Sequence, residues 1–239
     1  MLENIDVIIW FEDLSSPDLI AILDAVHLPQ IELARAASFK SVTHRRYYTL
    51  TRKYLRLTLS KYLLTPPDSI NFFTAERGKP YIDPIQNTAN ISFNISHSDR
   101  FLVVVIVKGE EVGIDVELIK PVTNLDELAK HCMSSFEYSH FHSRHRSHKL
   151  ATFYRIWTRK EAYLKALGMG LYRDPQSFTL PLATSSTALP IIDNESALTK
   201  TWFVQPLNLF TRHACICSLV TTSEESVIKS YSYCYFNND

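Results

Sequence analysis

The sequence predicts an α+β protein built from two similar halves. In each half, a helix-rich block is followed by strand-like segments with short turns between them. The segment "DRFLVVVIV" at 99–107 also has a counterpart in "TRHACICSLV" at 211–220, so that Arg100 and Arg212 are 112 positions apart in a chain of 239 residues. A unit of about 110 residues is a usual size for a domain. We therefore expect an N-terminal half at 1–112 and a C-terminal half at 113–239.

The composition indicates a globular protein without a strong charge preference. Hydrophobic residues make up 46% of the chain, and 25 basic side chains balance 25 acidic ones, which gives no reason to expect nucleic-acid or membrane-surface binding. The first residues, "MLENIDVIIWFEDL", carry acids where a signal peptide carries positive charge, and "FLVVVIV" is too short to span a membrane. We therefore expect a cytoplasmic protein. We also expect its cysteines to be reduced and mostly buried, because the four lack paired CxxC spacing: Cys132, Cys215, Cys217 and Cys234.

The N-terminal half should begin with a strand and continue with helices. The run from Asp6 to Phe11 is rich in β-branched and aromatic residues, which predicts a strand. At "SSPDL", Ser16 can cap a helix that has Pro17 at its first position. Residues 30–62 are mostly helical in pattern and rich in basic residues, and the tandem prolines of "TPPD" end this stretch.

Strands dominate the middle and the end of the chain. "INFF" predicts a strand before the turn-rich "AERGKPYIDP", and residues 91–118 read as three strands joined by turns at "SHSDR" and "KGEE". Residues 124–139 and 148–167 are expected to be helical. Further strands are predicted near "SFTLPL", "KTWFVQPL", "HACICSLVTT" and "IKSYSYCYF".

Paired acids in the strand "GIDVE" are candidate metal ligands. Side chains alternate along a strand, so Asp115 and Glu117 share a face, and Gly113 allows another backbone to come close. Hard oxygen ligands of this kind suit Mg²⁺ or Mn²⁺, with water or phosphate completing the coordination. An exposed acidic strand end is the other interpretation of this pattern.

The helix containing "WTRKEAYLKALG", residues 157–168, places Glu161 and Lys165 on one face. A Glu followed by a Lys four positions later is also an ordinary stabilising pair worth about 0.2–0.5 kcal/mol. The pattern alone therefore fits either a solvated helix or reaction chemistry.

Two turns and a histidine-rich segment are further candidates. His97, in the predicted turn after "FNIS", and the basic turn "RGKP" at 77–80 can each meet a phosphate or simply be exposed. The segment "HFHSRHRSH" at 140–148 holds four histidines, but its arginines would repel a bound cation. A solvated loop, or a basic patch for an acidic partner, suits this segment better than a metal site.

Taken in order, four of these motifs resemble the 4′-phosphopantetheinyl transferase superfamily, in its longer, monomeric, surfactin-synthetase-activating type. They are "GKP" at 78–80, "FNISHS" at 93–98, "VGIDVE" at 112–117 and "WTRKEAYLKALGMGL" at 157–171. The resemblance covers roughly residues 30–180. It implies a pseudo-dimer of two α+β halves, each with helices packed on a small antiparallel sheet, and an active site in the cleft between them.

The resemblance also implies the reaction and its central residues. The family transfers the phosphopantetheine arm of coenzyme A to a serine of an apo carrier protein and releases adenosine 3′,5′-bisphosphate. Its metal ligands match Asp115, Glu117 and Glu161, which would hold Mg²⁺, with Mn²⁺ as a possible substitute. Glu161 matches the proposed general base, and Lys165 matches the lysine that steadies the pyrophosphate and protonates the leaving group.

The remaining implied contacts belong to coenzyme A and to the carrier. The residues that match the family's coenzyme-binding positions, besides Lys165, are Arg35, Arg77, Gly78, Lys79, Pro80, Asn94, Ser96 and His97. Arg35 is placed by its position four residues before Phe39, and "KSVTHRRYY" departs from the family pattern around Arg46. The expected partner is an acidic acyl, peptidyl or aryl carrier. The alternative is a coenzyme- or carrier-binding module that has lost its chemistry.

Overall fold

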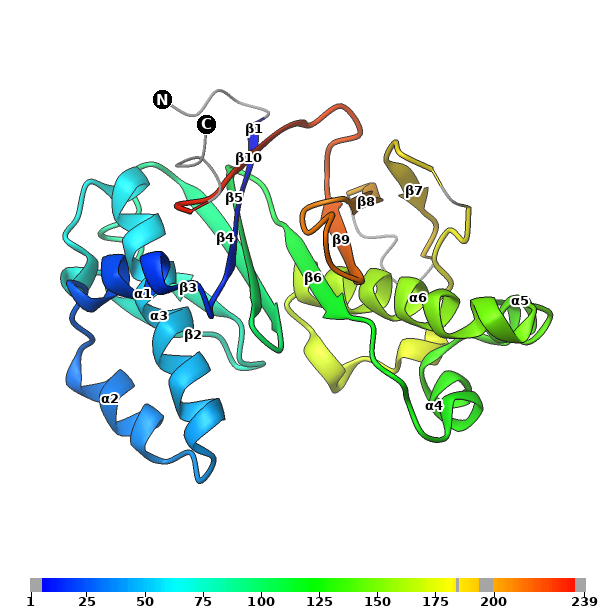
Figure 1. Cartoon of the computed structure of the whole chain (residues 1–239). Helices are drawn as coiled ribbons and strands as arrows, with labels where there is room; N and C mark the ends of the chain where they lie inside the picture. The colour runs from blue at the N-terminus through cyan, green and yellow to red at the C-terminus, as the bar shows by residue number, and fades with distance from the viewer. Residues whose placement is uncertain (1–5, 184, 194–199, 235–239) are drawn as a thin grey trace.

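The computed structural model describes residues 6–183, 185–193 and 200–234 of the chain. Two lobes lie side by side, and each contains helices and a four-stranded sheet (Figure 1). None of the helices in these ranges combines the length and the hydropathy that a membrane span requires. All four cysteines are free thiols, as predicted.

The first sheet has the strand order β10-β1-β5-β4. Its strands are β1 (Asp6–Asp13), β4 (Ile91–Ser98), β5 (Phe101–Lys108) and β10 (Val227–Tyr231). The β1–β5 and β5–β4 pairs are antiparallel, but β10 pairs in parallel with β1. The prediction of a purely antiparallel sheet is therefore wrong here, because the edge strand arrives from the C-terminal end of the chain and not through a hairpin.

Helices cover one face of this sheet (Figure 1). They are α1 (Pro17–Asp24) and α3 (Val42–Leu63), while α2 (Gln30–Ala37) packs on α3. The short helix η1 (Pro67–Ser69) and the hairpin of β2 (Phe72–Thr74) and β3 (Pro80–Ile82) follow α3 along the chain. The Ser16 hydroxyl accepts from the Leu19 amide and Pro17 is the first residue of α1, as predicted. The prolines after α3 end it at Leu63.

The second sheet has the order β6-β9-β8-β7 and is antiparallel throughout. Its strands are β6 (Gly113–Leu118), β7 (Leu189–Ile191), β8 (Trp202–Leu207) and β9 (Cys215–Thr221). Its helices are α4 (Leu125–Cys132), α5 (Ser135–His142) and α6 (Arg146–Ala166), with the short helices η2 (Gly170–Tyr172) and η3 (Pro175–Ser177) after them. The long helix α6 packs against β6 and β9.

The same topology occurs in both lobes. In the first, a strand (β1) is followed by three α-helices and a pair of strands whose second member, β5, lies between the other two. In the second, β6 is followed by three α-helices, and β9 lies between β6 and β8. The two segments that resemble each other in the sequence, 99–107 and 211–220, contain all but the last residue of these inner strands, β5 and β9.

Strand β5 is buried on both faces, which explains its unbroken apolar run. Its side chains pack alternately against α1 and α3 and against β6 and β9. The first set is Leu102, Val104 and Ile106, and the second is Phe101, Val103, Val105 and Val107. The second set shares one core with Ile114 and Val116, so β6 is held against the first sheet.

Two local predictions are wrong. "SFTLPL" contains η3 and irregular backbone, although Phe178 and Leu180 are buried. His97 lies within β4 and not in the turn, because β4 continues to Ser98 and only Asp99 and Arg100 connect it to β5. The predicted strand at "IKSYSYCYF" ends at Tyr231, and its last two residues lie outside the described ranges. The boundary between 112 and 113 stays a prediction.

A buried ion-pair network joins α2 to α3. The Glu32 carboxylate accepts from Arg56 Nε at 2.8 Å and from Arg52 Nε at 2.9 Å, and only 2% of Arg56 is exposed. Burial by itself raises the pKa of Glu32, but the hydrogen bonds and charges of Arg56 and Arg52 outweigh it and hold this pKa below its ordinary value of 4.5.

Glu32→Gln should lower the free energy of unfolding by about 3–5 kcal/mol at neutral pH, because it leaves a buried arginine without its counter-charge. A carboxylate with a lowered pKa stabilises the fold above its unfolded pKa and loses this effect as the pH falls through its folded pKa. Urea unfolding measured from neutral pH down to about pH 3.5 should therefore show a decreasing gap between the free energies of unfolding of the wild type and the variant. Glu127→Gln, on the exposed face of α4, is the control; a gap that persists in acid would contradict the ion-pair explanation.

Candidate functional site

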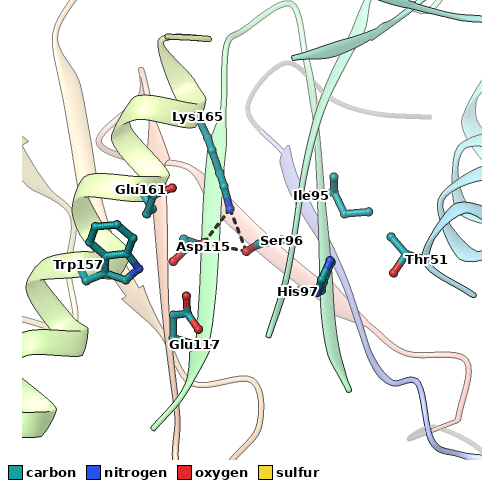
Figure 2. A pocket seen from close by; sticks show the side chains of 9 residues that line it. All are labelled: Thr51, Ile95, Ser96, His97, Asp115, Glu117, Trp157, Glu161 and Lys165. Atoms are coloured by element: carbon teal, nitrogen blue, oxygen red, sulfur yellow. Dashed lines mark hydrogen bonds and ion pairs between the residues drawn. The ribbon is translucent and has the colours of Figure 1, made fainter. Parts of the chain in front are cut away.

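A cavity of about 330 Å³ opens where β4, β6 and α6 meet. Figure 2 shows the nine side chains around it, with α6 and β6 on one side and β4 and α3 on the other. They are Thr51, Ile95, Ser96, His97, Asp115, Glu117, Trp157, Glu161 and Lys165. The structure thus brings together six of the residues predicted for the site.

Strand β6 and helix α6 supply the three predicted carboxylates. Asp115 and Glu117 lie two positions apart on β6, and Glu161 faces them from α6. The predicted close approach at Gly113 is confirmed. A Cβ atom there would lie 2.5 Å from the Ala166 amide nitrogen and would collide with the Ala162 carbonyl oxygen. Glycine therefore lets α6 lie directly on β6.

Lys165 extends from α6 toward β6 and β4 (Figure 2). Its Nζ donates to Asp115 Oδ1 at 2.6 Å, to Ser96 Oγ at 2.9 Å and to the Ile114 carbonyl oxygen at 3.2 Å. The predicted pairing of Lys165 with Glu161 along the helix is therefore replaced by an ion pair with Asp115, in which 25% of the lysine side chain is exposed. This leaves the ammonium group facing the cavity.

The carboxylates crowd one another. Burial, followed by the charges of Asp115 and Glu117, raises the pKa of Glu161, and the positive charge of Lys165 only partly opposes this. Burial and the charge of Asp115 likewise raise the pKa of Glu117, against hydrogen bonds from Ser98 and Trp157. Two oxygens, Asp115 Oδ2 and Glu161 Oε1, are buried without a hydrogen-bond partner. A group of this kind favours a cation.

The donor set fits a hard divalent cation, although the observed side-chain conformations do not gather around one. Three carboxylates on one cavity, two of them with an unpartnered buried oxygen, match the oxygen ligands that Mg²⁺ prefers. In the part of the chain that the structure describes, however, no three His, Cys, Asp or Glu side chains are arranged to hold a metal ion. One reason is that Lys165 occupies Asp115 Oδ1. The histidine-rich segment, 140–148, forms no such group either.

The residues of "FNISHS" divide between two faces of β4. His97 reaches the cavity on the side of α3, where the surrounding protein and the charges of Lys165 and His44 lower its pKa. Asn94 and Ser96 point the other way and hydrogen-bond to β6 through the Ile114 and Val116 amides. Of these predicted coenzyme contacts, only His97 offers an exposed side chain.

The "RGKP" turn does not line this cavity. Gly78 has a positive φ of 89°, which closes the turn between β2 and β3. Lys79 is buried, and its Nζ donates to Glu111 Oε2 at 2.9 Å and to the Ala166 carbonyl oxygen at 3.2 Å. Arg77 is exposed beside it, and Pro80 begins β3.

The remaining predicted contact, Arg35, lies on α2 with its guanidinium over the Phe39 ring, outside the lining of the cavity. The coenzyme A assignments all stay predictions; they are those of Arg35, Arg77, Gly78, Lys79, Pro80, Asn94, Ser96, His97 and Lys165.

Sequence reasoning missed several residues that shape the site. Trp157 lines the cavity and opposes the rise in the pKa of Glu117, and Thr51 lines the cavity from α3 with a buried hydroxyl that has no partner. Ser98 donates to Glu117. Lys160, next to Glu161, is fully buried in an ion pair with Glu137. The alternation of "NISHS" with "GIDVE" is the sequence signal that could have identified Ser98, and the spacing of four residues to Glu161 is the one that could have identified Trp157. Thr51 and Lys160 have no such local signal.

Comparison with known proteins agrees with this arrangement of motifs. A family model described as the 4′-phosphopantetheinyl transferase superfamily matches residues 111–217, and one described as the N-terminal part of 4′-phosphopantetheinyl transferase matches residues 16–109. The chain is 36% identical to the 4′-phosphopantetheinyl transferase HetI of Nostoc sp. over 166 residues, covering 70% of each protein. It is 31% identical to the transferase gsp of Aneurinibacillus migulanus, covering 73% of this chain and 67% of that one.

Two further similarities complete the comparison. The 4′-phosphopantetheinyl transferase Sfp of Bacillus subtilis is 32% identical, with coverage of 64% of this chain and 66% of the relative. The crystal structure of Thermotoga maritima holo-[acyl-carrier-protein] synthase aligns with a TM-score of 0.31 and 20% identity over 48% of this chain and 63% of that chain. By its sequence relatives, the chain belongs to the 4′-phosphopantetheinyl transferase superfamily, is of the type that includes Sfp, and is an enzyme of this kind.

Proposed function

We propose that the protein transfers the 4′-phosphopantetheine arm of coenzyme A to a serine of an apo carrier protein, in a Mg²⁺-dependent reaction that releases adenosine 3′,5′-bisphosphate. The observation that carries this proposal is the common cavity of Asp115, Glu117, Glu161 and Lys165. A module that had lost its chemistry would have no need to keep all four charged groups around one space.

The two lobes are proposed to form a pseudo-dimer, with 1–112 and 113–239 as its halves and coenzyme A held between them. The repeated topology supports this, since β1, β5 and β4 have counterparts in β6, β9 and β8. The cavity has walls from both lobes. His97 and the basic residues of the "RGKP" turn are the proposed contacts of the coenzyme's 3′-phosphate end.

Each charged group has a defined task in this proposal. The oxygen of the carrier serine bonds to the β-phosphorus as the bond from that phosphorus to adenosine 3′,5′-bisphosphate breaks. Glu161 accepts the hydroxyl proton, and Lys165 steadies the pyrophosphate and donates a proton to the departing oxygen. Mg²⁺, held by Asp115, Glu117 and Glu161, with Mn²⁺ as a substitute, would neutralise the phosphate charge and polarise the phosphoryl group.

The proposed partner is an acidic acyl, peptidyl or aryl carrier of a fatty-acid, polyketide or nonribosomal-peptide synthase. Residues 118–150 are the proposed docking region, because they expose Leu128 and Phe136 and contain the basic residues Arg144 and Arg146. We propose that the enzyme acts as a monomer in the cytoplasm. The molar mass of the purified protein, measured by light scattering, tests whether it is a monomer.

To test this proposal, the protein is incubated with coenzyme A, Mg²⁺ and each of several apo carriers, and the mass of each carrier is measured by mass spectrometry. We expect one carrier class to gain one phosphopantetheine arm. Glu161→Gln should slow this gain by about 10²–10⁴-fold, the usual contribution of a general base, while Glu224→Gln, an exposed residue of the β9–β10 connection, should not. Coenzyme binding without transfer to any carrier would overturn the proposal, and a near-normal rate for Glu161→Gln would remove Glu161 as the base.

A further inference from the structure

Strands β4 and β6 run side by side without main-chain pairing. Each is the edge strand of its own sheet, so β4 belongs to the β10-β1-β5-β4 sheet and β6 to the other. Edge strands have a row of unpaired amide and carbonyl groups. Here, side chains of β4 meet the amides of β6.

Three side chains on one face of β4 accept these amides at regular intervals. Asn94 Oδ1 accepts from the Ile114 amide at 3.0 Å, Ser96 Oγ from the Val116 amide at 3.3 Å, and Ser98 Oγ from the Leu118 amide at 3.2 Å. Residues two apart on a strand share a face, which explains the spacing on both strands. We call Asn94, Ser96 and Ser98 the side-chain ladder.

The two serines of the ladder also hold the carboxylates. Ser96 Oγ donates to Asp115 Oδ1 at 2.7 Å, and Ser98 Oγ donates to Glu117 Oε2 at 2.5 Å. A hydroxyl has one proton to donate, so each serine commits it to one carboxylate. Because the same oxygen is fixed by the next amide of β6, each carboxylate is tied to the backbone that carries it.

Ser96 has no remaining capacity for a ligand. Its oxygen donates to Asp115 and accepts from both the Val116 amide and Lys165 Nζ, which exhausts one donor and two acceptor positions. Ser98 does not line the cavity. In this structure, each hydroxyl therefore commits its proton to a carboxylate and has none left to donate to coenzyme A.

We propose that Ser96 and Ser98 are positioning residues, which orient Asp115 and Glu117 as metal ligands by joining the two sheets through the side-chain ladder. This inference rests on the proposed function, because it assigns a second layer to the same metal site. Removing a hydrogen-bond partner of a metal ligand typically weakens metal affinity or activity by about 10–100-fold.

Ser98→Ala is the sharper test, because Ser98 lies outside the cavity. Mn²⁺ binding, followed by electron paramagnetic resonance with and without coenzyme A and without any carrier, should weaken by about 10–100-fold. Transfer should fall at low metal concentration and recover as the concentration rises, with the KM for coenzyme A at saturating metal unchanged. Ser98→Thr keeps the hydroxyl and should restore Mn²⁺ affinity. Ser92→Ala is the matched control, on the same face of β4 by alternation and, among the described residues, without a hydrogen bond to β6.

The outcomes separate this inference from the proposed function. A wild-type protein that neither binds Mn²⁺ nor transfers the arm contradicts the proposed function. If the wild-type protein does both and the Ser98→Ala variant has unchanged Mn²⁺ affinity, the positioning role of the side-chain ladder is overturned and the proposed function stands. If Ser98→Ala fails to fold, Ser98→Cys, which has nearly the same shape but a weak donor, takes its place; unchanged Mn²⁺ affinity in that variant overturns the ladder as well.

Discussion

Gly113→Ala is expected to reduce transfer by about 10²-fold or more, although Gly113 is not among the residues that line the cavity. The added Cβ would lie 2.9 Å from Ala166 Cβ and would collide with the Ala162 carbonyl oxygen. Helix α6 must therefore move away from β6, and it carries both Glu161 and Lys165. A displacement of about 1 Å between reacting groups costs about 10²-fold in rate.

The same substitution should destabilise the fold by about 1–3 kcal/mol, the usual cost of overpacking a close contact. Steady-state kcat/KM for a carrier and urea unfolding measure the two effects. Gly109→Ala is the control. It lies in the turn before β6 at a φ of 71° and meets only ordinary contacts, so it should cost about 1–2 kcal/mol and leave kcat/KM intact. Normal kcat/KM in Gly113→Ala would show that the contact between β6 and α6 does not position the site.

Lys160→Met is expected to lower the free energy of unfolding by about 3–5 kcal/mol, because it leaves a buried carboxylate uncompensated. Lys160 Nζ lies 2.7 Å from Glu137 Oε2, and both side chains are fully buried. Burial lowers the pKa of Lys160, and the charge of Glu137 opposes this. Lys160 also donates to the carbonyl oxygens of Pro175 and Phe178, at 2.6 and 2.8 Å.

The matched control for this variant is Lys149→Met. Lys149 lies on the same helix and pairs with Asp126 of α4 at 2.9 Å, but 53% of the Asp126 side chain is exposed. Surface pairs of this kind contribute about 0–1 kcal/mol. Urea unfolding of the two variants should therefore differ by several kcal/mol. Equal stabilities would refute a special role for the buried pair.

Periodicity and turn chemistry predicted most elements from the sequence, because those signals are local. The Ser16 cap, the glycine of the turn at 109 and the apolar run of β5 each act within a few residues. The failure at "SFTLPL" shows the limit of such signals. Phe178 and Leu180 are buried as the alternation suggests, but the backbone there bonds to side chains, namely those of Lys160, Arg159 and Glu137, and not to another strand.

The chemistry of the candidate site was predictable because four motifs in one order resemble a known family. The contacts between these motifs were not predictable. Lys79 was predicted to meet coenzyme A, whereas its partners Glu111 and Ala166 lie 32 and 87 positions away along the chain. Lys165 was predicted to pair with Glu161 but pairs with Asp115, because β6 lies directly against α6. Contacts of this range follow from tertiary packing, which local spacing does not encode.

Strand β10 makes the two lobes dependent on each other during folding. It follows the last strand of the second sheet and returns to pair with β1 of the first, with Ile8 opposite Lys229. Until the ribosome has released residue 231, β1 has only one neighbour and an open edge, which is a liability for misassembly. Such a non-local pairing is slow to form. Because β10 follows β9 along the chain, this pairing ties the first sheet to the lobe that carries Glu161.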